Sequence, residues 1–367
     1  MSSQYLVNQT STLESQDPVP PSQARAAQIP LQSFTLPTFP PEAFRSATDL
    51  NQLILTSDIK LDEYTEILTK PFQVPDLPAS IKSLTLELFS LGYAPGFLTE
   101  LGKKLPGLKA LTLYSQLLAG TTPDSRQDAL AFIRFQAALQ EIHLLDVFVP
   151  PGFMTEFSEK LSKGLKFLEL NFTFRHSDPE FLKSLNAAEV VKLLEGRGGL
   201  VGVTLSVSAP DVTEDEDDRE GTEVGVMVIK SGKETTALVD ALEGNGGGLV
   251  MCDVSMFELS IEEVGKVLNA CTKIKILGVS VWLEKGWEEL VEGLGKNERG
   301  VEVLEVVGVP GVELVERMKG GEEVGISRDG LEKLSRSWKG LKSVRVSILR
   351  TKVEQWVNGD KGWEKKV

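Results

Sequence analysis

Few residues in this sequence have the types and spacing that catalytic chemistry requires. The histidines, His143 and His176, and the cysteines, Cys252 and Cys271, are scattered along the chain, and together they give no recognisable spacing of a structural zinc site. The sequence contains no Walker A loop, no Gly-x-Ser-x-Gly and no His-Glu-x-x-His. Catalysis by His143 would need a nucleophile or a second base within hydrogen-bond reach, and no motif offers one. We therefore expect no catalytic residue, no metal site and no cofactor.

The charge balance excludes two classes of partner. The 367 residues include 39 Lys and Arg against 53 Asp and Glu, which gives a net charge of −14. Nucleic acids and anionic membranes both require a basic surface, so we expect neither as a partner. The N-terminus lacks a charged start followed by an apolar run, and no stretch reaches the roughly 20 apolar residues of a membrane helix. We expect a monomer in the cytoplasm, with the nucleus as the alternative, and both thiols reduced.

One short pattern recurs along the chain: apolar, two variable residues, apolar, one variable residue, apolar. Each copy predicts a strand whose fourth residue faces the core, which places Leu84, Leu111, Ile142, Leu168 and Val203 in one buried row. Cys252 falls in a core position of the same kind, and we expect it to be an unreactive packing residue. Leu31 begins an eleventh candidate copy. The ten firm copies begin at Leu50, Ile81, Leu108, Leu139, Leu165, Leu200, Leu249, Ile274, Val301 and Leu341.

Helices are predicted between the strands. The segments PGFLTELGKKL from Pro95 and PGFMTEFSEKL from Pro151 match at seven of eleven positions, at a distance of two repeats. Leu98, Leu101 and Leu105 have the spacing of one helical face. Cys271 ends a similar apolar face, so we expect it to be buried as well. The sequence therefore predicts strands and helices in alternation.

The fifth residue of the motif decides which α/β architecture these elements form. It is polar in most copies, as Thr112, Glu169 and Arg345 illustrate. A doubly wound sheet is covered by helices on both faces, and its strands are apolar almost throughout. A sheet with one polar face has helices on the other face only. The pattern therefore favours a curved solenoid.

On these ten copies, the sequence resembles the leucine-rich repeat superfamily, and most closely the irregular, helix-rich arrays of fungal F-box-type proteins. The resemblance covers roughly residues 50–349 and implies an α/β horseshoe of about ten repeats, with parallel strands on the concave face and helices on the convex face. No recognisable F-box precedes the repeats. The asparagine that usually follows each strand is replaced by Phe89, Gln116, Val147 and Thr173.

The predicted domain organisation follows the repeats. Residues 1–30 are rich in Ser, Gln and Pro, and we expect them to be disordered. The solenoid is expected to span residues 31–358, with an acidic insertion at residues 210–222 that contains the sequence TEDEDDRE. Residues 359–367 are expected to form a C-terminal tail.

The resemblance and the strand pattern together imply function. A row of solvent-facing side chains on a parallel sheet suits a protein partner, so we expect a non-catalytic interaction scaffold, with a substrate-receptor-like adaptor as the form that the F-box resemblance implies. The alternative is a regulator of a small GTPase, which would need a positioned Arg or Asn at a repeat edge. Aromatic and acidic residues on the solvent-facing positions predict a basic partner. The predicted binding residues are Thr85, Glu87, Thr112, Tyr114, Glu141, His143, Phe167, Glu169 and Asn171.

Overall fold

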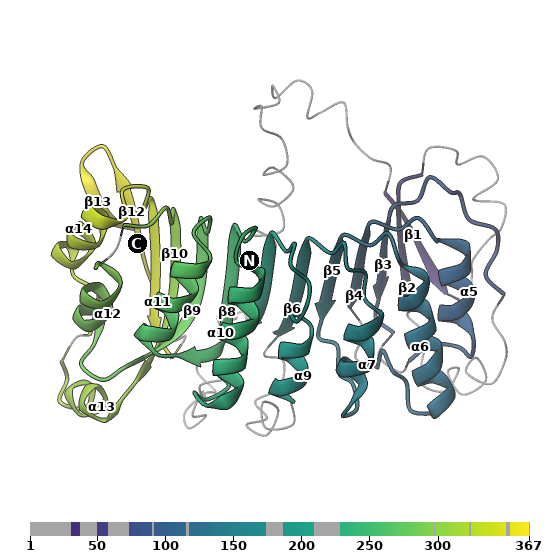
Figure 1. Ribbon diagram of the computed structural model, residues 1–367, viewed down its shortest axis with the longest axis horizontal. Coiled ribbons are helices and arrows are strands. Elements are labelled where there is room, and N and C mark those ends of the chain that lie inside the picture. The colour runs from purple at the N-terminus through teal and green to yellow at the C-terminus, as the bar shows by residue number, and fades with distance from the viewer. Residues whose placement is uncertain are drawn as a thin grey trace, which may run out of the picture. The chain divides into compact units, whose positions relative to one another are not determined.

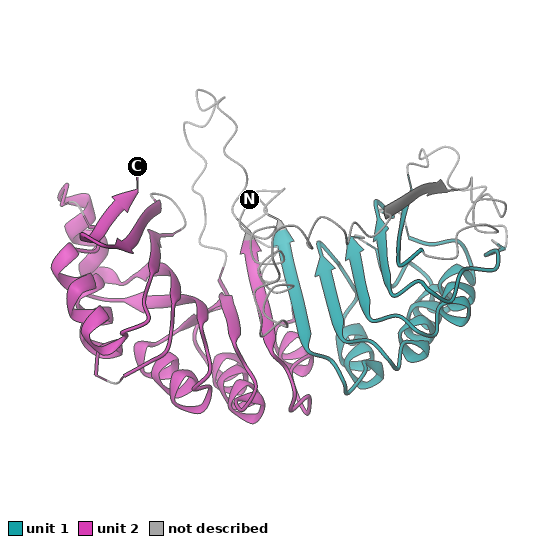
Figure 2. Ribbon diagram, turned by 90° about the horizontal axis from the view of Figure 1, so that it is seen from above, with its two compact units in different colours: residues 1–172 teal, residues 173–367 magenta. Residues whose placement is uncertain are grey.

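A computed structural model of the chain describes residues 31–36, 50–57, 73–89, 92–114, 117–173, 186–208, 228–296, 298–322, 324–349 and 353–366. The chain divides into two compact units, residues 1–172 (unit 1) and residues 173–367 (unit 2). In each unit the helices lie along one side of the strands (Figure 2).

Unit 1 is a parallel sheet whose strands follow one another in chain order (Figure 1). Its strands are β1 (Leu31–Leu36), β2 (Gln52–Ser57), β3 (Ser83–Glu87), β4 (Ala110–Tyr114), β5 (Glu141–Leu145) and β6 (Phe167–Thr173), the last residue of which already belongs to unit 2. Its helices are α5 (Phe97–Lys104), α6 (Pro123–Phe135) and α7 (Phe153–Lys160).

Unit 2 also alternates strands and helices, but its last two strands reverse direction. Strands β7 to β11 pair in parallel, whereas β12 and β13 are antiparallel to their neighbours. The strands are β7 (Gly202–Ser208), β8 (Met251–Leu259), β9 (Ile276–Leu283), β10 (Val303–Pro310), β11 (Ser343–Ile348), β12 (Val353–Gly359) and β13 (Gly362–Lys366). The helices are α9 (Ala187–Lys192), α10 (Lys233–Asn245), α11 (Ile261–Ala270), α12 (Trp287–Leu294), α13 (Val312–Lys319) and α14 (Arg328–Ser337).

The sheet confirms the α/β class and the mostly parallel pairing that the repeats predict. Strands β2 to β11 each begin two residues after the start of one motif copy. Leu84, Leu111, Ile142 and Leu168 are register partners on successive strands, and all are buried. Val203 is buried in the corresponding place on β7 of unit 2. The predicted core row is confirmed in both units.

The eleventh copy forms a strand, but its register differs from the prediction. If LQSFTL followed the motif, its fourth residue, Phe34, would pair with Leu53. The structure instead pairs Phe34 with Leu55 and Leu31 with Gln52. The shift is two residues, so the alternation of the backbone is kept. A strand at the end of a sheet has one neighbour only, and the motif alone does not fix its register.

Apolar residues fill two of the positions at which leucine-rich repeats usually carry asparagine. Phe89 and Val147 are buried there. Directly before them the chain turns through Leu88 and Asp146, whose φ angles are +58° and +50°. The Leu88 N–H donates to the carbonyl of Tyr114 at 3.1 Å, and the Asp146 N–H donates to the backbone of β6 at 2.9 Å. Backbone hydrogen bonds to the next strand thus satisfy the turn without an asparagine side chain.

The two matched PGF segments contain the whole of α5 and of α7. Gly96 and Gly152 precede these helices with φ angles of +75° and +81°, a conformation that favours glycine. Phe97 and Phe153, the first helical residues, are buried. Glycine offers no side chain to cap the free N–H groups of a helix start. For α5 the carboxylate of Asp128, from the neighbouring α6, accepts two of those N–H groups.

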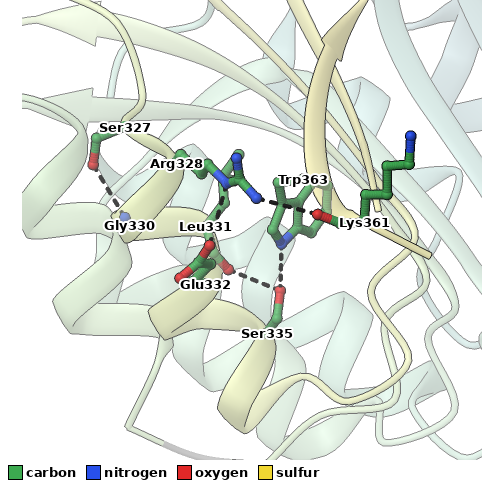
Figure 3. A network of polar contacts seen from close by, with 8 residues as sticks. All are labelled: Ser327, Arg328, Gly330, Leu331, Glu332, Ser335, Lys361 and Trp363. Carbon is green, nitrogen blue, oxygen red and sulfur yellow. Dashed lines mark hydrogen bonds and ion pairs between the residues drawn. The ribbon is translucent and has the colours of Figure 1, made fainter. Parts of the chain in front are cut away.

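The C-terminal residues are a second difference from the prediction. We expected a tail at 359–367, but β13 lies there and pairs with β12. Trp363 is buried and its indole N–H donates to Ser335 Oγ of α14 at 2.9 Å (Figure 3). The Arg328 guanidinium of α14 donates to the carbonyl of Lys361 at 3.2 Å. Burial of the indole and the hydrogen bonds hold this hairpin against α14.

Two other predictions fall on residues that the structure does not describe. The expected disordered segment at 1–30 and the acidic insertion at 210–222 both lie outside the described residues. The described chain resumes at Val228, and Ile229 forms an isolated parallel bridge with Phe257 of β8. The first described residues after the insertion therefore lie beside β8 in the sheet of unit 2.

Candidate functional site

The sheet of unit 1 presents one face away from its helices, and the predicted binding residues lie there. They fall on three rows of register partners across β3 to β6. Neighbouring strands are about 4.8 Å apart, so partners in a row touch one another. The first row ends in Glu141 and Phe167, the second is Thr85, Thr112, His143 and Glu169, and the third includes Glu87, Tyr114 and Asn171. All nine predicted residues are brought together.

Their exposure corrects one part of the prediction. The residues on β3, β4 and β5 are half-buried. Those on β6 are nearly covered, because Phe167 is 7%, Glu169 6% and Asn171 5% exposed. Phe167 is therefore not the solvent-facing aromatic residue that we expected. The alternation of a strand gives the face of a side chain, whereas its exposure depends on what packs beside it.

His143 and Glu169 form the best-defined contact on this face. His143 Nδ1 lies 2.7 Å from Glu169 Oε2. With the carboxylate ionised, the ring donates from Nδ1, and this fixes the orientation of the imidazole. Among the described residues, the ring has no other hydrogen-bond partner. His143 Nε2 is thus the polar atom that the pair leaves for a bound molecule or for water.

The corresponding face of unit 2 holds a charged row at the fifth position of the motif, outside the predicted binding residues. Asp253, Gly278, Glu305 and Arg345 are register partners on β8 to β11. A Cβ on Gly278 would lie 2.6 Å from the carboxyl carbon of Asp253, so this carboxylate extends over the glycine toward Glu305. Burial raises the pKa of Glu305, the charge of Asp253 raises it further, and Arg345 opposes both.

An exposed aromatic residue lies further along the same face. Trp282, near the end of β9, is 39% exposed. Lys230 Nζ lies 5.9 Å from the centre of its ring and 3.0 Å from Glu258 Oε2. The six-residue motif ends three residues before Trp282, so the motif gives no signal for it. The alternation of β9 beyond the motif, in which Val281 and Leu283 are buried, would have placed it outward.

The cysteines are buried in unit 2, as expected of packing residues. Cys252 lies in the core and Cys271 ends α11. Burial raises the pKa of both thiols, that of Cys271 to about 11 with a smaller contribution from Glu243. A thiol with such a pKa is almost entirely protonated at neutral pH, and the thiolate is the reactive form. Neither residue is a candidate nucleophile.

Comparisons with known proteins add no name to this geometry. A scan against protein-family models finds no match, and a search of the curated proteins finds none. Within the described part of the chain, no helix is long and apolar enough to cross a membrane. In the same ranges, no group of three or more His, Cys, Asp or Glu side chains is arranged to hold a metal ion. The two sheet faces are therefore the features from which function can be inferred.

Proposed function

We propose that the protein is a non-catalytic interaction scaffold of the leucine-rich repeat type, and that a protein partner binds to the sheet face of unit 1. One observation carries the proposal. Three register rows of polar and aromatic side chains lie on one face of a parallel sheet, while α5, α6 and α7 cover the other. Such a face offers closely spaced, rigidly held side chains to a surface of another protein.

The charges on this face favour a basic partner. Glu87 in the third row and Glu141 in the first row are half-buried, Glu169 lies beside His143, and the chain as a whole carries a net charge of −14. Carboxylates on a surface attract a basic partner and repel an acidic one, which affects the association rate and specificity more than the affinity. In this proposal the protein acts in the cytoplasm or the nucleus, where its two free thiols stay reduced.

Two forms of this function differ in the partner. An adaptor of the kind that the F-box resemblance implies would recruit substrates to a ubiquitin ligase. A regulator of a small GTPase would need an exposed Arg or Asn at the edge of a strand. The asparagine in the third row, Asn171, is 5% exposed. The adaptor form therefore fits this face better.

Affinity purification with matched variants tests the proposal. Glu141→Lys reverses a charge on the proposed face, and Glu159→Lys makes the same change at an exposed position on α7, away from it. We expect partners to be recovered with wild type and with Glu159→Lys, and to be lost with Glu141→Lys. Ligase subunits among them would support the adaptor, and a GTPase would support the regulator.

The purified partner then allows a quantitative test. Tyr114→Ala should weaken its binding by about 2 kcal/mol, the loss typical of an interface aromatic. The melting temperature of the variant should stay close to that of wild type, because Tyr114 is only half-buried. If Tyr114→Ala and Glu141→Lys both bind the partner as tightly as wild type does, the face has been assigned wrongly.

A further inference from the structure

Two apolar side chains of unit 2 are exposed at neighbouring positions. Trp282 is 39% and Val312 is 73% exposed. The residue before Val312 is Gly311, and a Cβ on this glycine would lie 2.9 Å from Trp282 Cζ2. The indole ring therefore packs against the backbone at the start of α13. Trp282 and Val312 thus lie on either side of Gly311, and we call this pair of exposed apolar side chains the Trp282 patch.

The core of unit 2 does not use this patch. On β9, Val281 and Leu283 are buried, so the alternation of the strand leaves Trp282 on the opposite face. On α13, Leu314 is the only buried residue, and it anchors the helix. Tryptophan is seldom left exposed without a use, because its large apolar area favours burial. An exposed aromatic on a rigid strand is a typical anchor of a protein interface.

Carboxylates surround the patch. Glu284 Oε1 accepts the backbone N–H of Glu313 at 3.1 Å, which holds the Glu284 carboxylate beside Gly311. Glu313 itself is exposed on the first turn of α13. Glu258 pairs with Lys230, whose ammonium group lies near the indole ring of Trp282. The electron-rich face of the Trp282 indole attracts cations, and the Lys230 ammonium group already lies near it.

We propose that the Trp282 patch binds a segment of a partner protein that places an apolar side chain next to a lysine or arginine. The inference rests on the proposed scaffold function and assigns a second docking surface, with its partner chemistry, to unit 2. The apolar side chain covers Trp282 and Val312, and the cation meets Glu284 and Glu313. This combination is complementary to the patch in both polarity and charge.

A second copy of the chain is a poorer occupant. A twofold contact through the patch would bring the same carboxylates of both copies together, since a twofold interface repeats one surface on both sides. Each copy also carries a net charge of −14. Like charges across an interface oppose association. The acidic rim therefore selects a basic segment of another protein.

A phage-displayed library of random 12-residue peptides, selected on the full-length protein, supplies a probe whatever the identity of the partner. We expect selected peptides that combine aliphatic or aromatic residues with Lys or Arg. For these peptides, Trp282→Ala should weaken binding at least about tenfold, as loss of an interface anchor does. Glu313→Lys should weaken it too, and the loss should shrink as salt is added. Met318→Ala is the matched control, because Met318 is also exposed, at the far end of α13.

Three outcomes would overturn the inference. Recovery of no peptide that needs Trp282 would show that the patch binds no such segment, and so would acidic peptides that bind through Trp282. Dimers that dissociate on Trp282→Ala in light scattering would identify a second copy as the occupant. The unit 1 face is judged separately with Tyr114→Ala, since peptides that need Tyr114 and not Trp282 would support the proposed function while rejecting this patch. Circular dichroism on Trp282→Ala should show an unchanged fold.

Discussion

Replacing Asp128 should destabilise a helix to which it does not belong. Asp128 is buried on α6, and its two carboxylate oxygens accept the backbone N–H groups of Leu98 at 3.1 Å and Thr99 at 2.8 Å. These are the second and third residues of α5, whose own cap position is occupied by Gly96 without a side-chain hydrogen bond. Asp128→Ala removes both acceptors and leaves the start of α5 without a cap.

The expected loss follows from the two hydrogen bonds. A hydrogen bond to a charged group contributes about 1.5–3 kcal/mol, and loss of an N-cap side chain costs about 0.5–2 kcal/mol. The Leu98 N–H is buried, whereas the Thr99 N–H is partly accessible to water, which replaces some of its bond. We therefore expect the free energy of unfolding to fall by about 2–4 kcal/mol. At about 2–4 °C per kcal/mol, the melting temperature should fall by about 4–16 °C.

Urea and thermal unfolding followed by circular dichroism measure this loss. Asp128→Asn should be intermediate, because its amide oxygen can accept one of the two N–H groups while its NH₂ group cannot. Asp240→Ala is the matched control, since Asp240 is exposed on α10, and it should change the free energy of unfolding little. A loss below about 1 kcal/mol for Asp128→Ala would refute the assignment of Asp128 as the cap of α5.

Three further outcomes are expected. Leu168→Ala, in the buried row of β6, should lower the free energy of unfolding by about 2–5 kcal/mol in urea titrations, as core truncations do, and a loss below about 1 kcal/mol would contradict its burial. Native protein should react with Ellman's reagent only slowly at pH 8, because the pKa of Cys271 is about 11 and Cys252 is buried, whereas urea should release both thiols. Burial raises the pKa of Glu305 above its ordinary value of 4.5, so the folded state holds the proton more tightly and stability is lost as the pH rises through the raised pKa. Glu305→Gln should therefore melt above wild type near neutral pH and lose that advantage below pH 4.5; an equal melting temperature at every pH would count against a raised pKa of Glu305.

The strand positions could be predicted from the sequence because each motif copy contains its own alternation. Leu111 and Ile142 are the fourth residues of their motif copies, and the strand register pairs them directly. The same reasoning failed at both ends. Leu31 begins a strand with only one neighbour, and its register is two residues from the motif. Trp363 lies in a hairpin with no motif copy, where it is buried and bonds to Ser335 of α14, a contact that no local pattern encodes.

The sequence predicts which side chains lie on the unit 1 face, but it does not predict how exposed each of them is. Thr112, His143 and Glu169 share a row because they hold the same place in successive copies. The motif says nothing of how much neighbouring side chains cover one another. Phe167 alternates outward and is nevertheless almost covered. A prediction of a binding anchor from alternation alone therefore needs the packing of the neighbouring strand as well.

Strand length explains why an exposed aromatic lies on a strand of unit 2. Strands β3, β4 and β5 have five residues each and end soon after the motif, whereas β8, β9 and β10 have eight or nine. The longer strands carry outward positions past the rows that the motif defines. On β9 the outward residues continue from Gly278 through Ser280 to Trp282. The sequence holds this signal, since Val279, Val281 and Leu283 keep the alternation beyond the motif. Tracing the alternation to the end of each strand would have placed an outward aromatic at Trp282.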